Sequence, residues 1–265
     1  MVSMGNVWDR TVDVLRGRAG IITPIAALAI LLPNVLSAGV TSFSPTSPGS
    51  ALAGAAVALA SVVATIWGTL AIIAIATDPA TGRADAQAQA SARLLPALGV
   101  VLVLGAILTL AFVPIIVALI RAGVDFTRPD TAAQMSGGAA GFILLYGLVL
   151  MAFALWLSAR IVLLNPVILN ERRGLRAIPR SIELTQGLTG KLIAVLLLFS
   201  LVVLIPTLAV QAVVGVVVRL IVGQEGIAAA TFAAAAAGAV VTTASSVVAA
   251  VFTAQLYVAV RERQG

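Results

Sequence analysis

Cysteine and histidine are both absent from this sequence. Their absence excludes disulfides, thiolate nucleophiles, imidazole bases and most transition-metal sites, because each of these needs a thiol or an imidazole group. Only ten acidic residues remain for general acid–base chemistry. We therefore expect no catalytic residues, no metal site and no cofactor, and we predict that the protein is not an enzyme.

Charged residues are scarce as well. They make up 10% of the chain, whereas hydrophobic residues make up 61%; soluble domains average about 25% charged and about 45–50% apolar residues. An apolar run of about 20 residues is long enough to cross the hydrocarbon core of a membrane as a helix. The sequence therefore predicts an all-α polytopic membrane protein with six transmembrane helices, at roughly 20–42, 51–77, 95–120, 138–164, 190–222 and 227–259.

Lysine is nearly absent, since Lys191 stands beside 15 arginines. When basic residues are assigned to the connections between predicted spans, 13 fall on one side of the membrane and three on the other. Positive charge is retained in the cytoplasm, so both termini and the segment 170–190 are predicted to be cytoplasmic. The net charge of +6 thus reflects topology and not nucleic-acid binding. The excess of arginine, with abundant alanine and glycine, is typical of a GC-rich bacterial genome. We predict that the protein lies in the inner (plasma) membrane of a bacterium.

Two polar segments are predicted to be amphipathic helices in the membrane interface. The first has an apolar face made of Trp8, Thr11, Val12 and Leu15, and it should end at Gly17. The second has an apolar face made of Leu175, Ile178 and Ile182. Its charged face consists of Arg173, Arg176, Arg180 and Glu183. In the second helix Pro179 fits the first turn and Gly187 the end.

The two segments also match each other at an offset of 170 residues, with Arg10, Thr11 and Gly17 corresponding to Arg180, Ser181 and Gly187. A proline interrupts the span after each segment, and a third span repeats this design after the polar stretch RADAQAQASAR; these prolines are Pro33, Pro114 and Pro206. We predict three repeated units of an interfacial amphipathic helix plus a helical hairpin, at about 6–80, 82–172 and 174–263, within a single membrane domain, 1–265. An approximate three-fold rotation should relate the hairpins.

One stretch, SARIVLLNPVILNERRGLRAIPRSIELTQG, resembles a known family over about the second half of the chain. The matching positions are Arg160, Pro166, Glu171, Gly174, Ser181, Leu184, Thr185 and Gly187. The pattern is similar to the membrane domain attached to some bacterial glycerophosphoryl diester phosphodiesterases, and to related stand-alone inner-membrane proteins of unknown function. In those enzymes a soluble barrel domain performs hydrolysis, and these 265 residues contain no such domain. The resemblance implies a membrane domain in a lipid-related context and not a hydrolase.

Arg160 is the sharpest candidate site residue, because it lies near the end of one apolar run with a second apolar stretch after it. Its counterparts in the predicted repeat are Ala71 and Leu256, so the charge is particular to the second unit. One interpretation is a ligand for a lipid phosphate or another anion, together with Arg176 and Arg180. The other is an arginine that extends to the interface and enforces topology.

Several polar residues inside the apolar runs are further candidates. Asn165 and Pro166 indicate either a kink near a helix end or a broken helix whose carbonyls line a cavity. The last span is rich in small residues, which favours tight helix packing. Its Thr242, Thr243, Ser245, Ser246 and Gln255, with Gln211, are an alternative lining for a polar path, although such hydroxyls often bond to their own helix.

None of the ten acids falls within a predicted span, which disfavours proton-coupled transport. Asp125 and Asp130 are an alternative divalent-ion pair, but an ordinary solvated loop is the simpler interpretation. We predict a non-catalytic membrane protein that binds membrane lipid, anionic lipid foremost, or a protein partner in envelope homeostasis. The alternative is a transporter or permease for a small apolar or lipidic compound, which a cavity converging on Arg160 and Gln211 would favour.

Overall fold

A computed structural model describes residues 3–44, 47–124, 136–223 and 226–263. Within these ranges the chain is helical and has no strand. The first half contains α1 (Met4–Ala26), the π-helix η1 (Ala27–Leu31), α2 (Leu32–Phe43), α3 (Pro48–Thr77) and α4 (Arg83–Arg121). The second half contains α5 (Gly137–Arg160), α6 (Leu164–Asn170), α7 (Ala177–Leu184), α8 (Thr189–Val222) and α9 (Ile227–Glu262).

Six helical segments in the described part of the chain are long and apolar enough to cross a membrane, when Met4–Phe43 and Gly137–Asn170, which joins α5 and α6, are each counted as one. They contain the six apolar runs of the sequence. A helix suits this environment because it satisfies its backbone hydrogen bonds internally, where no water is present to do so. The prediction of an all-α polytopic membrane protein is therefore confirmed.

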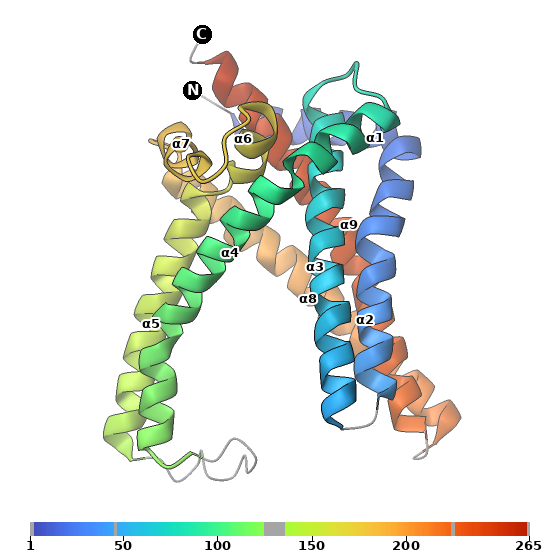
Figure 1. Ribbon diagram of the computed structural model, residues 1–265, viewed down its shortest axis with the longest axis vertical. Helices are drawn as coiled ribbons and strands as arrows, with labels where there is room; N and C mark the ends of the chain where they lie inside the picture. The colour runs from blue at the N-terminus through green and yellow to red at the C-terminus, as the bar shows by residue number, and fades with distance from the viewer. Residues whose placement is uncertain (1–2, 45–46, 125–135, 224–225, 264–265) are drawn as a thin grey trace.

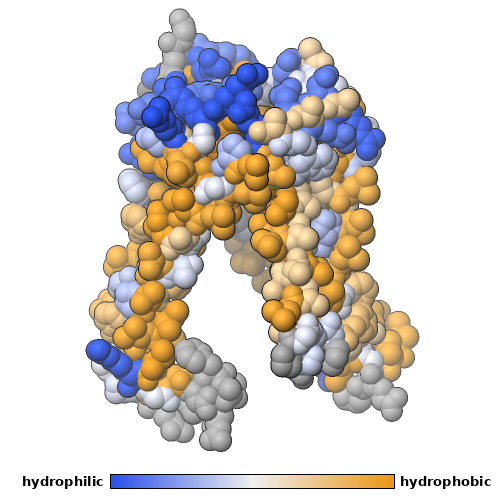
Figure 2. All heavy atoms as spheres, in the orientation of Figure 1, coloured by the Kyte–Doolittle hydropathy of each residue, from blue (hydrophilic) through white to orange (hydrophobic). Residues whose placement is uncertain are grey.

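Polar side chains gather at one end of the molecule. The start of α1, the end of α9, α6 and α7 lie together there (Figure 1). Figure 2 shows that hydrophilic residues cover this end and that apolar residues cover the long helices leading away from it. We call this region the charged end. Its position agrees with the prediction that the two chain ends and the segment 170–190 share one side of the membrane.

The long helices contact one another in a ring. α2 packs on α3, α3 on α4, α4 on α5, α5 on α8, α8 on α9, and α9 returns to α1 and α2. α3 also packs directly on α9. Away from the charged end, a wide hollow separates the α4–α5 pair from the α2–α3 pair (Figures 1 and 2). The ring order suits three consecutive hairpins, while their relation by a three-fold rotation stays a prediction.

Three segments at the charged end share a fully buried pair of residues four positions apart. The pairs are Val7 and Thr11 in α1, Ala86 and Ala90 in α4, and Ala177 and Ser181 in α7. The first and third pairs are separated by the same 170 residues as the sequence match. In the first two cases the segment continues directly into the following span, whereas α7 is a separate helix.

Glycine has different effects in the two amphipathic segments. The prediction that Gly17 ends the first helix was wrong, because α1 continues through it to Ala26. A glycine inside a helix costs only about 1 kcal/mol, and the apolar residues that follow Gly17 favour continuation. Gly187 instead adopts a φ of 77°, a left-handed conformation that ends a helical segment, as predicted.

The buried face of α7 differs from the predicted apolar face. Ala177, Ser181 and Leu184 are buried, whereas Leu175 is 55% exposed and Ile178 is only partly buried. The reason is the contact with the end of α5, where the Ser181 hydroxyl donates to the Arg160 carbonyl at 3.0 Å. Small side chains permit this close approach, and the larger aliphatic ones lie beside it.

Pro33 follows a π-helical turn. In η1 the Leu32 N–H donates to the carbonyl of Ala27, five residues earlier. Pro33 has no N–H, and its ring crowds the carbonyl four residues before it. The Asn34 side-chain amide donates to the Ile30 carbonyl at 2.7 Å. Pro114 and Pro206 differ from Pro33, because α4 and α8 continue through them as α-helices. π-Turns within α-helices occur frequently at functional sites.

The part of α3 nearest the charged end is the most completely buried helical stretch in the described part of the chain. Seven consecutive residues of α3, Leu70 to Ala76, are buried, so this part of the helix is surrounded on all sides. At its end the Arg18 guanidinium donates to four backbone carbonyls, those of Ile75, Asp78, Pro79 and Thr81. A helix leaves its last carbonyls without partners, and a single side chain from α1 supplies donors to this one.

Candidate functional site

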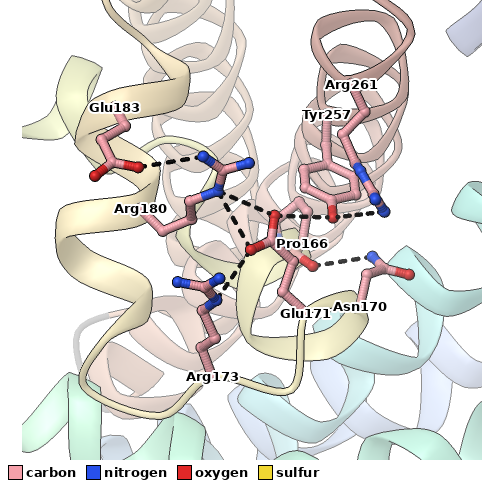
Figure 3. A network of polar contacts seen from close by, with 8 residues as sticks. All are labelled: Pro166, Asn170, Glu171, Arg173, Arg180, Glu183, Tyr257 and Arg261. Carbon is pink, nitrogen blue, oxygen red and sulfur yellow. Dashed lines mark hydrogen bonds and ion pairs between the residues drawn. The ribbon is translucent and has the colours of Figure 1, made fainter. Parts of the chain in front are cut away.

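Glu171 is the centre of a polar network at the charged end (Figure 3). Its carboxylate lies 3.1 Å from Arg173 Nε and 3.3 Å from Arg180 Nε. The Tyr257 hydroxyl of α9 donates to the same carboxylate at 3.4 Å, and Arg261 donates to the Tyr257 hydroxyl at 3.4 Å. Glu171 therefore joins the end of α6 to α7 and α9, and its side chain is only 12% exposed.

The turn between α6 and α7 aims these side chains inward. Glu171 follows the last residue of α6, and Arg172 takes a φ of 54°, which reverses the chain. Such a conformation is uncommon for a residue other than glycine. α7 begins after this turn with Pro179 in its first turn, as predicted.

Arg180 is engaged by two acids in this network. Besides Glu171, its Nη1 lies 3.2 Å from Glu183. The hydrogen bond to Glu183 raises the pKa of the Arg180 guanidinium; desolvation opposes this shift, and Glu171 adds to it. The guanidinium thus remains charged and is largely compensated by protein carboxylates.

Arg160 is held in a different way, at the end of α5. Its carbonyl accepts a hydrogen bond from the Ser181 hydroxyl at 3.0 Å, and the Thr185 hydroxyl lies 3.2 Å from the same carbonyl. Its guanidinium lies over the Trp156 ring, 5.6 Å from the ring centroid, and makes a long contact of 3.5 Å with the Ile182 carbonyl. The structure shows that the helix breaks here, because α5 ends at Arg160 and α6 begins at Leu164.

The charge of Arg160 has no carboxylate partner among the described residues, and its buried Nε has no hydrogen-bond partner there either. The residues that correspond to it in the predicted repeat, Ala71 and Leu256, are both fully buried. In the predicted repeat, the second unit would therefore carry a cation where the other two carry apolar core residues. Of the three predicted anion ligands, Arg160 is partly buried beside α7, Arg180 is paired with acids, and Arg176 is exposed at the start of α7.

The predicted cavity-lining residues lie in three separate places. Asn165 is partly buried in α6. Gln255 is 8% exposed and donates to the Ala76 carbonyl of α3 at 2.6 Å, so it joins α9 to α3. Gln211 lines a pocket of about 460 Å³ between α8 and α9 together with Arg219. Gln211 is 22 residues beyond the start of α8, or about 33 Å along the helix axis. It is therefore far from Arg160, which lies at the charged end.

A second pocket, of about 560 Å³, lies among α2, α3, α4 and α9. Six polar side chains line it: Asn34, Ser37, Ser61, Thr65, Thr242 and Ser246. Ser61 and Thr242 are near the middle of the 30-residue α3 and the 36-residue α9, so the pocket lies about halfway along the helices. We call it the mid-helix pocket.

Sequence reasoning found only part of the mid-helix pocket. Thr242 and Ser246 are among the residues that the sequence offers as an alternative lining of a polar path, whereas Asn34, Ser37, Ser61 and Thr65 are not. Ser61 and Thr65 are four residues apart, as are Thr242 and Ser246; two such pairs on separate helices are the available signal. Asn34, directly after Pro33, is another.

Metal ligands do not gather in the part of the chain that the structure describes, where no group of three His, Cys, Asp or Glu residues lies close together. The alternative ion pair Asp125 and Asp130 lies outside the described residues. Comparisons with known proteins found no matching family model, no similar curated protein and no similar solved structure. The resemblance to the phosphodiesterase membrane domain therefore stays a prediction.

Proposed function

We propose that this protein binds an anionic membrane lipid at its charged end and has no catalytic role. The observation that carries the proposal is the state of Arg160, a partly buried cation without a carboxylate partner among the described residues. A charge near membrane depth is unfavourable unless it is paired or reaches water. A lipid phosphate would supply the missing negative charge, and a guanidinium binds phosphate oxygens well because its donors form a planar fork.

The surroundings of Arg160 suit a lipid headgroup. Tryptophan is enriched at the membrane–water interface, and Trp156 lies directly beneath the guanidinium. The neighbouring helix α7 begins at the exposed Arg176, which adds positive charge at the same end. Each basic residue near an anionic leaflet contributes about 1 kcal/mol to its attraction. Arg180 contributes less to this proposal than expected, because Glu171 and Glu183 already compensate it.

An apolar track leads from Arg160 along α5. Phe153 stacks on Trp156 with a centroid separation of 5.8 Å, and Phe142 stacks on Tyr146 at 5.6 Å. With Val149 between them, these residues repeat at intervals of three and four and so share one helix face with Arg160. Phe153, Trp156 and Val149 are largely exposed. An acyl chain can therefore lie against this face while its headgroup reaches the guanidinium.

We further propose that the charged end faces the cytoplasm of a bacterium and that the protein resides in the inner membrane. The asymmetry of 13 to three basic residues supports this orientation.

The test is the retention of phosphatidylglycerol by purified protein, measured by lipid mass spectrometry after a mild-detergent wash. Arg160→Gln keeps a polar side chain and removes the guanidinium proposed to bind the phosphate directly, so we expect about tenfold less bound lipid, as for the loss of a charged hydrogen bond of about 1.5 kcal/mol. Arg160→Lys should retain an intermediate amount, because it keeps the charge and loses the planar fork.

Arg16→Gln is the matched control, since Arg16 is an exposed arginine at the same end. It should retain about as much phosphatidylglycerol as the wild type, because purified protein in detergent has no anionic leaflet to provide the general attraction of basic residues. If all folded variants retain the same amount, Arg160 is an anchor that only sets topology, and the proposal is wrong.

A further inference from the structure

Three of the six polar side chains that line the mid-helix pocket, Ser61, Thr242 and Ser246, donate their single hydroxyl hydrogen to the protein backbone. The Ser61 hydroxyl lies 2.8 Å from the Val57 carbonyl and 3.0 Å from the Pro33 carbonyl. Thr242 donates to the Gly238 or Ala239 carbonyl, both at 3.1 Å. A hydroxyl has one hydrogen and two acceptor lone pairs. What these side chains offer to a ligand is therefore acceptor capacity.

Ser246 and Asn34 also donate to the backbone. Ser246 donates to the Thr242 carbonyl at 2.8 Å. The Asn34 amide nitrogen donates one of its two hydrogens to the Ile30 carbonyl in the π-helical turn, which leaves one N–H donor and the side-chain carbonyl oxygen as an acceptor. Three hydroxyl oxygens and one amide oxygen thus present lone pairs, while Ser37 and Thr65 add two further hydroxyls. The pocket is richer in acceptors than in donors.

Charge is missing from the lining, which includes no ionisable residue. An ionic ligand halfway through the membrane would have no counter-charge, and a buried unpaired charge is strongly unfavourable. The rest of the lining is apolar, with Ala58, Val62, Ile66 and Val101 among the polar residues. Such a surface complements an uncharged ligand that has both a hydrogen-bond donor and an apolar body. A volume of about 560 Å³ is also within the range of small-molecule sites, about 300–1,000 Å³.

The pocket wall is held in place by contacts that do not involve a ligand. The Asn34 side chain is fixed by its bond to Ile30, and Ser61 bridges α3 to the Pro33 carbonyl of α2. α3 also lies very close to the π-helical turn, where a Cβ added at Gly68 would be 2.7 Å from the Ala29 Cβ. The acceptors are therefore pre-positioned, which lowers the entropic cost of binding.

From these observations we infer that the mid-helix pocket is a binding site for an uncharged alcohol or primary amide with a short apolar body. The O–H or N–H group of the ligand would donate to Ser61, Thr242, Ser246 or Asn34, and its apolar body would lie against Val62, Ile66 and Val101. This site is separate from Arg160 and does not depend on lipid binding at the charged end.

A photoreactive eight-carbon alkanol that carries a diazirine is a suitable probe for protein reconstituted in phosphatidylcholine vesicles. After irradiation, mass spectrometry of peptides should find the label on α3 near Val62 and Ile66. Excess octanol should compete with it, whereas octyl methyl ether, which has the same apolar body and no donor, should not. Thr242→Val should reduce the labelling about threefold to tenfold, as expected for the loss of one hydrogen bond.

The matched control is Thr207→Val in α8, since Thr207 also donates to its own helix, at the Val203 carbonyl, and does not line the pocket. It should label as the wild type does. Equal competition by the ether would show an unselective apolar crevice and would overturn the inference. So would labelling spread evenly over the lipid-facing helix surfaces, or an identical response of the two threonine variants.

Discussion

Two regions of the molecule, α3 and the α4–α5 pair, are similarly apolar in sequence but have different surroundings. In α3, 44% of the most apolar stretch is buried, whereas in α4 and α5 the share is 6%. Near the charged end α3, α6 and α9 pack together, and away from it a hollow separates the helix pairs (Figure 2). Apolar composition alone therefore does not distinguish a protein core from a surface that faces lipid.

Side-chain size accounts for much of this difference. The buried face of α9 includes many small residues, among them Ala230, Gly238, Ala239, Ala250 and Ala254. Leucine and phenylalanine instead cover the exposed faces of α4 and α5, for example at Leu110, Phe112, Leu144 and Leu148. In a membrane the hydrophobic effect does not drive helices together, so close packing of small residues decides which helices associate. The interpretation of the last span as a tightly packed helix is confirmed.

The largest expected effect is on packing at Gly68. A Cβ at this position would lie 2.7 Å from the Ala29 Cβ and 3.4 Å from Ile30 Cγ1, so Gly68→Val should destabilise the protein through overpacking by about 3 kcal/mol, the upper end of the usual range. A Cβ added at Gly147 of α5 would have no atom outside its own helix within 4 Å. Gly147→Val should change stability by less than about 0.5 kcal/mol. Thermal unfolding in mild detergent compares the two, and equal losses would contradict the described difference in packing.

A smaller effect is expected at the charged end. Glu171→Gln removes the carboxylate that Arg173, Arg180 and Tyr257 share, so we expect a loss of about 2 kcal/mol, typical of hydrogen bonds to charged groups. The control is Glu183→Gln, because this side chain is 60% exposed and an exposed pair contributes little. If chemical unfolding in detergent detects no difference between the two variants, the network does not hold α6, α7 and α9 together.

The third prediction concerns the compartment that each end of the molecule faces, and no change in stability is expected. Because the chain has no cysteine, single cysteines can be labelled without background. Ser181 is fully buried, so the exposed Gln186 is the better position at the charged end, and the exposed Ser44 represents the opposite end. In intact bacterial cells a membrane-impermeant maleimide should label Ser44→Cys and leave Gln186→Cys unlabelled. The reverse pattern would overturn the proposed orientation.

The sequence predicted the helices well, because a run of 20 or more apolar residues has few other stable structures in a membrane. It also predicted the amphipathic segments and the end of the second at Gly187. It did not distinguish Gly17 from Gly187, since both follow an amphipathic stretch and only the backbone conformation separates a terminating glycine from one inside a helix. The buried face of α7 was likewise missed, because it depends on a contact with Arg160 that no local pattern reveals.

The candidate sites were harder to predict, because they are assembled from distant segments. Arg160 stood out as a charge beside an apolar run, yet nothing in the sequence indicated that Glu171 would engage Arg180 and leave Arg160 without an acid. The mid-helix pocket combines residues of four helices, and its isolated serines and threonines are individually ordinary in a membrane helix.

The contact between Arg18 and the end of α3 has a consequence for the order of events during synthesis. All of its partners, from Ile75 to Thr81, come from the first third of the chain. The first hairpin can therefore close once Thr81 has left the ribosome, before α4 has emerged. The later helices would then assemble against a unit whose ends are already joined, with α9, the last to be made, completing the ring against α1 and α2.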